Sequence, residues 1–156
     1  IAQANWPEKH WRTLSQNYAK APHFKAFSDQ IETLYQTSPR KWLTEANQHF
    51  LRGLCELLGL STPILNSIDY DLQGDRQQRI IDLCQKIGAD QYLSGPAARD
   101  YLDPALFKAA GIEVEWMSYQ GYPTYPQGKG PFTHYVTILD LLFNTGPSFQ
   151  DYLKPQ

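Results

Sequence analysis

Between Thr62 and Tyr119, short apolar runs alternate with helical patterns, and this alternation constrains the fold more than any other feature of the chain. The runs "TPILNS", "DQYLSG" and "IEVEWMSY" have the length of strands. The helical patterns "GDRQQRIIDLCQKIG" and "PAARDYLDPALFKAAG" follow the first two runs, and each ends at a glycine, Gly88 or Gly111. Strands separated by helices of this length predict a parallel sheet with crossover helices. We therefore expect an α/β fold with a small, three-layer parallel sheet of at least three strands.

The segment before this alternation has apolar residues at helical spacing only, which predicts helices and no strands. Apolar residues recur at helical spacing in three stretches, at 5–21, 22–35 and 42–58. Asn5 is placed to cap the first helix, with Pro7 in its first turn, and Gly59 is placed to end the third. We expect an all-helical segment over residues 1–60, followed by an α/β segment over 61–156 in the same single domain.

The last part of the chain combines a loop with two further helical patterns. The stretch "QGYPTYPQGKGPF", residues 120–132, is rich in Gly, Pro and Tyr and predicts a loop. "THYVTILDLLFN" predicts an apolar helix with Thr133 as its N-cap, and "GPSFQDYLK" predicts a short final helix.

Composition excludes several classes of protein. The 156 residues are 42% hydrophobic and 19% charged with a net charge of −2, which is typical of a soluble globular domain and not of a nucleic-acid binder. No apolar run approaches the roughly 20 residues of a membrane span, and no signal-peptide pattern is present. Cys55 and Cys84 lie on apolar stripes, which favours free thiols in the cytoplasm, although the sequence leaves a disulfide open. No zinc spacing, phosphate-binding loop or dinucleotide motif occurs, so we expect neither a metal nor a cofactor.

The stretch "YLSGPAARDYLD" is the first candidate site, because a strand ends where a helix with an arginine begins. Parallel sheets bind ligands along the edge where their strands end, and the first amide groups of a helix suit a phosphate or carboxylate. Ser94 and Gly95 would contribute a hydroxyl and close backbone approach, and Arg99 a charged donor. The alternative is a chain corner without a ligand, and the residues leave both open.

The loop and the helix after it supply the second candidate site. Tyr122 and Tyr125 could stack on the rings of a ligand. His134 is a candidate general acid or base, although a capping or packing role is the simpler interpretation. Asp140 places a charge inside an apolar run, so it must be paired, capping a helix, or catalytic.

Several stretches together resemble the WbqC-like protein family. They are "WPEKHWRTLSQNYAKAPHF", "LGLSTPI", "RIIDLCQKIGADQYLSGPAARDYLD" and "YPTYPQGKGPFTHYVTILDLLFNTG". The resemblance covers the middle and C-terminal part of the family. It implies a bacterial, cytoplasmic protein associated with the synthesis of surface polysaccharide such as O-antigen.

The chain departs from the family pattern at several points. The initial strand and its "Q-P-x-Y"-like turn are absent, which leads us to expect a chain that lacks part of its sheet and associates through the open edge, for example as a homo-oligomer. Arg76 and Gln77 replace a Lys-Thr pair of the family, and Thr133 replaces the acidic residue before the histidine.

Two functions follow from these expectations. The first is a biosynthetic protein that binds a nucleotide-linked or phosphorylated sugar, with a transferase of acyl or aminoacyl groups as the reaction to consider. In that function Ser94, Gly95 and Arg99 hold the anion, Tyr122 and Tyr125 stack on the ligand, and His134 and Asp140 are the catalytic candidates. The second is a non-catalytic binding or scaffold subunit of a polysaccharide assembly, which the absence of catalytic motifs favours.

Overall fold

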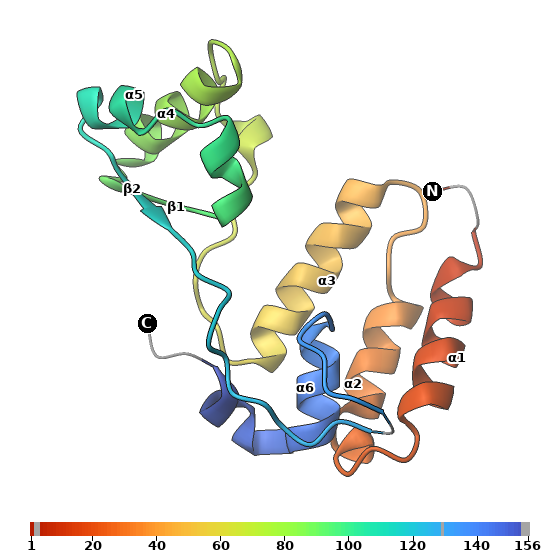
Figure 1. Ribbon diagram of the computed structural model, residues 1–156. Helices are drawn as coiled ribbons and strands as arrows, with labels where there is room; N and C mark the ends of the chain where they lie inside the picture. Colours follow the sequence, from red (N-terminus) through yellow and green to blue (C-terminus); the bar gives the residue numbers. More distant parts are fainter. Residues whose placement is uncertain (2–3, 129, 154–156) are drawn as a thin grey trace. The chain divides into compact units, whose positions relative to one another are not determined.

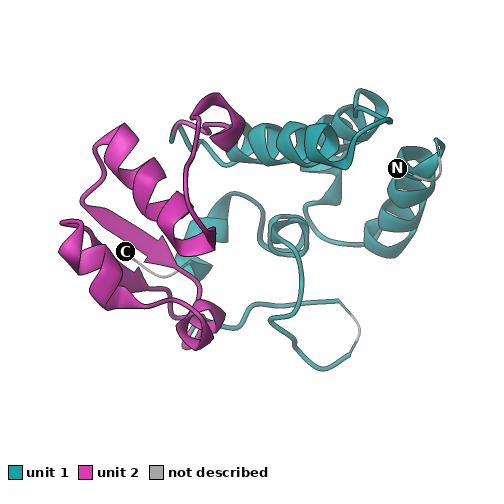
Figure 2. Ribbon diagram, turned by 90° about the horizontal axis from the view of Figure 1, so that it is seen from above, with its two compact units in different colours: residues 1–62, 122–156 teal, residues 63–121 magenta. Residues whose placement is uncertain are grey.

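A computed structural model describes residues 1, 4–128 and 130–153 of the chain (Figure 1). These residues form two compact units, which are coloured separately in Figure 2. Unit 1 combines residues 1–62 with residues 122–156, and unit 2 spans residues 63–121. The last third of the expected α/β segment therefore belongs with the helices of the first segment. The single domain expected from chain length stays a prediction.

Unit 1 is helical in its described residues. Its elements are α1 (Trp6–Tyr18), α2 (Phe24–Gln36), α3 (Leu43–Leu57), α6 (Ile138–Thr145) and the 3₁₀ helix η3 (Gly146–Tyr152). Helix α6 is mainly apolar and almost completely buried, its polar residues Asp140 and Asn144 included, so it forms the centre around which the amphipathic helices pack. The core consists of Ile31, Leu139, Leu142 and Phe143, and aromatic rings such as Trp11, Tyr18 and Phe24 pack against it.

Helix α6 begins later than the sequence predicts. Thr137, not Thr133, is its N-cap residue, and residues 133–137 are irregular. The backbone of Thr133 is instead engaged by Gln127, whose side chain donates to the Thr133 carbonyl and accepts from the Thr133 amide, both at 2.9 Å. Because the amide and carbonyl of Thr133 are already bonded to the Gln127 side chain, they are not available for the backbone hydrogen bonds of a helix. The short final helix is the 3₁₀ helix η3, and Lys154 of the expected range lies outside the described residues.

Unit 2 contains a parallel pair of strands covered by helices. Its elements are η1 (Ser67–Asp69), α4 (Arg76–Ile87), β1 (Gln91–Ser94), η2 (Pro96–Asp100), α5 (Pro104–Ala109) and β2 (Glu113–Trp116). Strands β1 and β2 are parallel, as the sequence predicts, with Gln91 opposite Glu113 and Ser94 opposite Trp116. The Asp75 side chain accepts hydrogen bonds from two amides at the start of α4, and Gly88 ends the helix with a positive φ of 70°.

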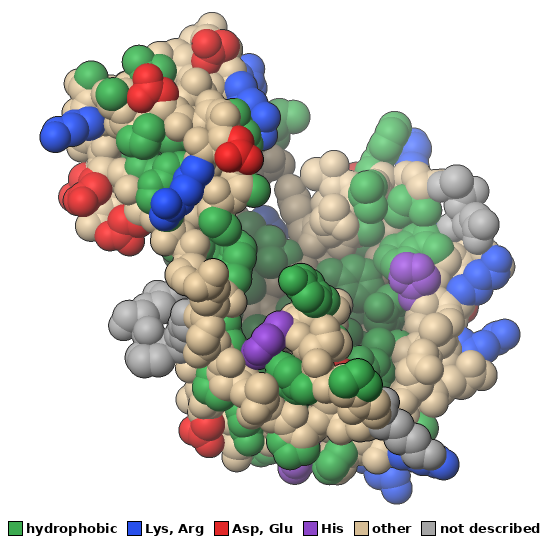
Figure 3. All heavy atoms as spheres, viewed as in Figure 1, with side chains coloured by type: hydrophobic (Ala, Val, Ile, Leu, Met, Phe, Trp, Pro, Cys, Tyr) green, Lys and Arg blue, Asp and Glu red, His purple; other side chains and the backbone are tan. Residues whose placement is uncertain are grey.

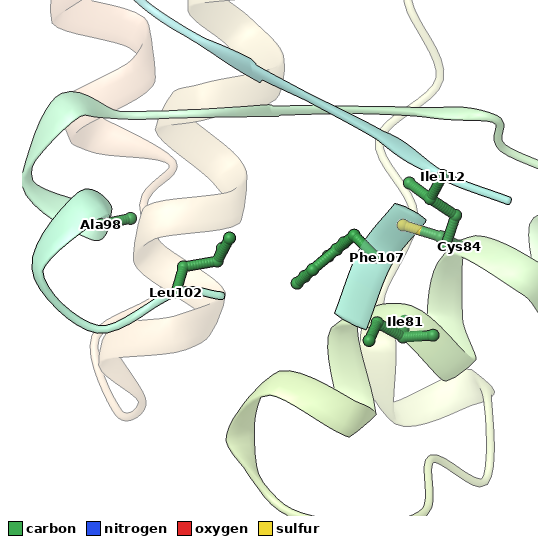
Figure 4. Packing of buried hydrophobic residues seen from close by; sticks show 6 residues of the cluster. All are labelled: Ile81, Cys84, Ala98, Leu102, Phe107 and Ile112. Atoms are coloured by element: carbon green, nitrogen blue, oxygen red, sulfur yellow. The ribbon is translucent and has the colours of Figure 1, made fainter. Parts of the chain in front are cut away.

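The core of unit 2 lies between α4, η2, α5 and the strands (Figure 4). Six side chains point into it: Ile81, Cys84, Ala98, Leu102, Phe107 and Ile112. The Tyr92 ring of β1 stacks on the fully buried Phe107 ring with centroids 5.4 Å apart. The cluster thus joins the helices to one face of the strand pair, while Leu93, which points to the other face, is 52% exposed.

The sheet is smaller than the sequence predicts. The described residues form a sheet of two strands, so neither a third strand nor a third layer is present among them. The expected first strand at residues 62–67 is irregular up to η1, and Asn66 accepts a hydrogen bond from the Ile68 amide at the start of that turn. This run has no strand beside it to satisfy its backbone, and Pro63 removes one donor from it. The coarser prediction of an α/β chain is confirmed.

Hydrophobic side chains also gather on the surface of unit 1. Figure 3 shows them where the surface is hollowed between α1 and α3. A cavity of about 380 Å³ lies there, lined mainly by Trp6, His10, Tyr35, Leu43 and Phe50. None of the helices in the described part of the chain combines the length and the apolar character that a bilayer span needs.

Candidate functional site

The first candidate site lies in unit 2, at the edge where both strands end. Because β1 and β2 are parallel and in register, the carboxyl ends of the two strands, Ser94 and Trp116, lie side by side. Gly95 follows Ser94 directly, and the chain then turns into η2. This is the edge at which open parallel sheets bind their ligands.

An arginine and two aromatic rings surround this edge. The Arg99 guanidinium lies over the Trp116 ring, 5.0 Å from the ring centroid, and Arg99 is exposed. Stacking of this kind holds a guanidinium in place while its N–H groups remain available to an anion. The Tyr119 hydroxyl lies 3.4 Å from the position that a Cβ atom would take at Gly95. A Cβ atom at position 95 would therefore be in van der Waals contact with Tyr119, which is 61% exposed.

The structure changes part of the reasoning behind this site. The stretch from Pro96 to Gly111, which the sequence predicts as one bent or two short helices, forms two: a 3₁₀ helix of five residues and the separate helix α5. So short a turn has little dipole to attract an anion, and Arg99 becomes the main source of positive charge. Ser94 is only 8% exposed and shares the covered face of β1 with Tyr92. Its hydroxyl therefore lies on the packed side of the strand.

The second candidate site lies in unit 1 and centres on Asp140, in the first turn of α6. This carboxylate is 6% exposed and accepts three hydrogen bonds from side chains. The Tyr18 hydroxyl donates to Oδ2 at 2.7 Å, the Tyr125 hydroxyl donates to Oδ1 at 2.7 Å, and the Gln127 amide donates to Oδ1 at 2.9 Å. The buried charge is paired with polar donors from α1 and from the loop, which is the first of the three roles that the sequence leaves open for it.

Burial and the carboxylate keep both tyrosines protonated. Burial, together with the hydrogen bond to Asp140, raises the pKa of Tyr125 to about 12. The same two causes, in the same order, raise the pKa of Tyr18 well above its usual value. Both hydroxyls therefore remain donors at neutral pH. A carboxylate whose oxygens already accept from three donors is suited to positioning the loop rather than to taking a proton from a substrate.

The other predicted residues of the loop lie near this cluster or beside it. The Phe132 ring contacts both the Tyr125 ring, at 5.2 Å, and the His134 ring, at 4.6 Å, in edge-to-face arrangements. His134 is exposed, and it is not among the side chains that donate to Asp140. Tyr122 is half-buried. Lys129, within the same loop, lies outside the described residues.

The predicted site residues thus divide between the two units. Ser94, Gly95 and Arg99 are brought together in unit 2, whereas Tyr125 and Asp140 are brought together in unit 1. Sequence reasoning missed Tyr18 and Gln127 as partners of Asp140, and Trp116 as the partner of Arg99. Tyr18 carried no signal beyond its helical spacing, because it lies 122 positions from Asp140. Among residues 1, 4–128 and 130–153, no three His, Cys, Asp or Glu side chains cluster as a metal ion requires.

Comparisons with known proteins agree with the resemblance seen in the sequence. The model of the WbqC-like protein family matches residues 1–152. The uncharacterized protein Rv1507c of Mycobacterium tuberculosis (strain ATCC 25618 / H37Rv) is 41% identical over 154 residues, which are 99% of this chain and 67% of the relative. No solved structure matches the chain significantly. From the length of the family match and the identity to this relative, the chain belongs to the WbqC-like protein family.

Proposed function

We propose that this protein takes part in the synthesis of bacterial surface polysaccharide of the O-antigen type and binds a nucleotide-linked or phosphorylated sugar. The single observation that carries the proposal is the exposed Arg99 guanidinium, stacked on Trp116 where the two parallel strands end. A fixed cation beside a glycine is suited to a phosphate, and the rings of Trp116 and Tyr119 offer stacking surfaces for a base or a sugar. We place the activity in the cytoplasm, in keeping with the free thiols of Cys55 and Cys84.

Binding of sugar nucleotides to wild type and to two arginine variants tests this proposal. Arg99→Ala should weaken binding of a uridine-diphosphate sugar by about tenfold or more, because a hydrogen-bonded charge is lost. Arg76→Ala is the matched control, since Arg76 is also exposed and stacks on a ring of unit 2, that of Tyr101, at 4.1 Å. Isothermal titration with uridine diphosphate, the sugar nucleotide and inorganic phosphate measures all three affinities. Equal affinities for Arg99→Ala and wild type would overturn the proposal.

The reaction that we propose to test first is transfer of an acyl or aminoacyl group to the bound sugar. A sugar hydroxyl or amine would attack the carbonyl carbon of an activated acyl donor, the bond to the donor's carrier would break, and the nucleophile would lose its proton to a base. His134, which belongs to unit 1, is the base that the sequence predicts; it is exposed, and its ring is in edge contact with Phe132. Loss of transfer in His134→Ala, with binding of the sugar nucleotide retained, is the expected result.

A second function, a non-catalytic binding or scaffold subunit, is favoured by one observation. The carboxylate of Asp140, a candidate catalytic group, already accepts hydrogen bonds from Tyr18, Tyr125 and Gln127. A protein that binds the sugar nucleotide but transfers no group from any acyl donor would support this alternative. Homo-oligomer formation stays a prediction, and sedimentation of the purified protein tests it.

A further inference from the structure

A groove between α1 and α2 of unit 1 has the make-up of a binding site and belongs to neither candidate site described above. Its volume is about 340 Å³, near the lower end of the roughly 300–1,000 Å³ of small-molecule sites. One helical ridge of α1 forms one wall through Glu8, Trp11 and Arg12, and Glu32 and Gln36 of α2 form the other.

Two aromatic rings line this groove. The rings of Trp11 and Tyr35 have centroids 6.1 Å apart and are tilted by 32°. Trp11 also packs against Phe24, and their ring centroids lie 6.0 Å apart with an interplanar angle of 14°. These ring contacts hold the Trp11 side chain, so it lines the groove without needing to be ordered by a ligand.

The polar groups of the walls are partly fixed in advance. Glu8 is held by Arg40, whose Nη2 lies 2.6 Å from Oε1 and whose Nη1 lies 3.0 Å from Oε2. Arg40 is itself anchored by donation to the Ala4 carbonyl at 2.8 Å. Within the described part of the chain, Arg12 and Glu32 form no ion pair. They leave one guanidinium and one carboxylate for an occupant of the groove.

The charges around the groove cancel. Glu8 is balanced by Arg40, and the charge of Arg12 is balanced by that of Glu32. A site for a phosphate would carry an excess of positive charge, and a site for an ammonium group would carry an excess of carboxylates over the rings. A balanced set of donors and acceptors around an aromatic surface suits a neutral ligand that has an apolar face and many hydroxyl groups, each of which both donates and accepts.

We infer that the groove between α1 and α2 binds a neutral saccharide ring, packed against the rings of Trp11 and Tyr35 that line it and hydrogen-bonded by Arg12 and Glu32. The carboxylate accepts from sugar hydroxyls, the guanidinium donates to them, and Gln36 can do both. The inference does not rest on the proposed anion site, which uses residues of unit 2 only. A second saccharide site in the same protein would suit an acceptor sugar or a growing glycan.

Nuclear magnetic resonance of the isotope-labelled protein tests this inference. The probes are D-glucose, D-galactose, N-acetylglucosamine and L-rhamnose, with tetramethylammonium and inorganic phosphate as charged probes. We expect at least one of the four sugars to shift the indole N–H signal of Trp11 and the amide signals of the groove. We expect both charged probes to leave these signals unchanged at the same concentration. The inference is overturned if none of the four sugars shifts the Trp11 signal, or if a charged probe binds more tightly than they do.

Variants of the walls make the test specific. Arg12→Ala and Glu32→Gln should each weaken sugar binding by about tenfold, the effect of losing one hydrogen bond to a charged group. Arg52→Ala, at an exposed position of α3 outside the groove, is the matched control and should bind as wild type does. The melting temperature of each variant confirms that it is folded. Unchanged affinity in both wall variants would overturn the inference, whereas Arg99→Ala should leave this affinity unchanged and so separates it from the proposed anion site.

Discussion

The two units of the molecule are held together in different ways. In unit 2, Asp75 and Asp103 cap the helices α4 and α5 with their side chains, and the core joins residues that lie between positions 81 and 112. In unit 1, α1, α2 and α3 have no side-chain cap among the described residues. Their packing depends instead on aromatic rings around α6 and on the buried carboxylate of Asp140. Tyr18 of α1 donates a hydrogen bond to this carboxylate although it lies 122 positions away in the sequence.

Unit 2 thus depends more on interactions between residues close in sequence, and unit 1 more on interactions between residues far apart in sequence. A capping side chain bonds to amides two or three residues away, and a stop glycine acts through its own backbone, so neither needs a tertiary contact. Burial of the Asp140 carboxylate, by contrast, is costly unless Tyr18 of α1 and Tyr125 of the loop donate hydrogen bonds to it. Substitutions in unit 2 should therefore act mainly through packing and caps, whereas those in unit 1 should act mainly through the polar cluster.

The largest effect should come from Phe107→Ala in the core of unit 2. Phe107 is completely buried, and its ring stacks on Tyr92. The free energy of unfolding should fall by about 3–5 kcal/mol because a cavity replaces the ring. Native-state amide exchange of residues 63–121 measures the loss. Leu106→Ala, a neighbour that is 48% exposed, is the control and should cost far less. Equal protection in both variants would show that this cluster does not hold the unit together.

A smaller but still large effect is expected of Asp140→Asn in unit 1. The substitution replaces one carboxylate oxygen, which accepts, by an NH₂ group, which donates. At least one of the three groups that donate to Asp140 would therefore lose its acceptor. We expect the free energy of unfolding to fall by about 2–3 kcal/mol, the cost of buried unsatisfied polar groups. Denaturant unfolding followed by aromatic circular dichroism measures it. Asp151→Asn, at an exposed position of the same unit, should stay near wild type, and a similar result for Asp140→Asn would contradict a stabilising polar cluster.

The same contrast explains which parts of the structure the sequence could predict. Strands β1 and β2 and helix α4 follow from local patterns, with Gly88 as the stop that the residues indicate. The expected strand at 62–67 is wrong because a strand exists only if another strand pairs with it, and periodicity says nothing of pairing. The sequence indicates that Asp140 is a buried charge that needs partners, yet no local pattern identifies Tyr18 as one of them. The start of α6 was placed too early because Gln127 bonds Thr133 from the loop.

A pair of N-cap substitutions should sharpen the comparison at a smaller scale. Asp75→Ala should lower stability by about 1 kcal/mol, because the carboxylate accepts from the amides of Gln77 and Gln78 at 3.0 and 2.9 Å. Asn5→Ala, at the corresponding position of α1, should cost only a few tenths of a kcal/mol because the Asn5 side chain makes no capping bond. Melting temperatures of the two variants decide the matter. An Asn5→Ala loss as large as that of Asp75→Ala would remove the distinction between the units.

The last effect concerns alkaline pH and Tyr125. Its pKa is raised to about 12 in the folded protein, whereas an unfolded tyrosine has a pKa of about 10. The stabilisation by the protonated hydroxyl is therefore present in full below about pH 10 and lost as the pH rises toward 12, since the unfolded chain releases its proton first.

Tyr125→Phe should lower stability at neutral pH by about 1 kcal/mol, the net value of one hydrogen bond. It should cost less than Asp140→Asn, because Gln127 still donates to the same carboxylate oxygen. The variant should also reduce the fall in stability above about pH 10 without abolishing it, because burial and the same carboxylate also raise the pKa of Tyr18. Urea unfolding at three pH values across this range, with the 99% exposed Tyr135→Phe as control, measures both effects. An unchanged alkaline slope in Tyr125→Phe would mean that the loop is held to α6 by Gln127 and the rings rather than by this hydroxyl.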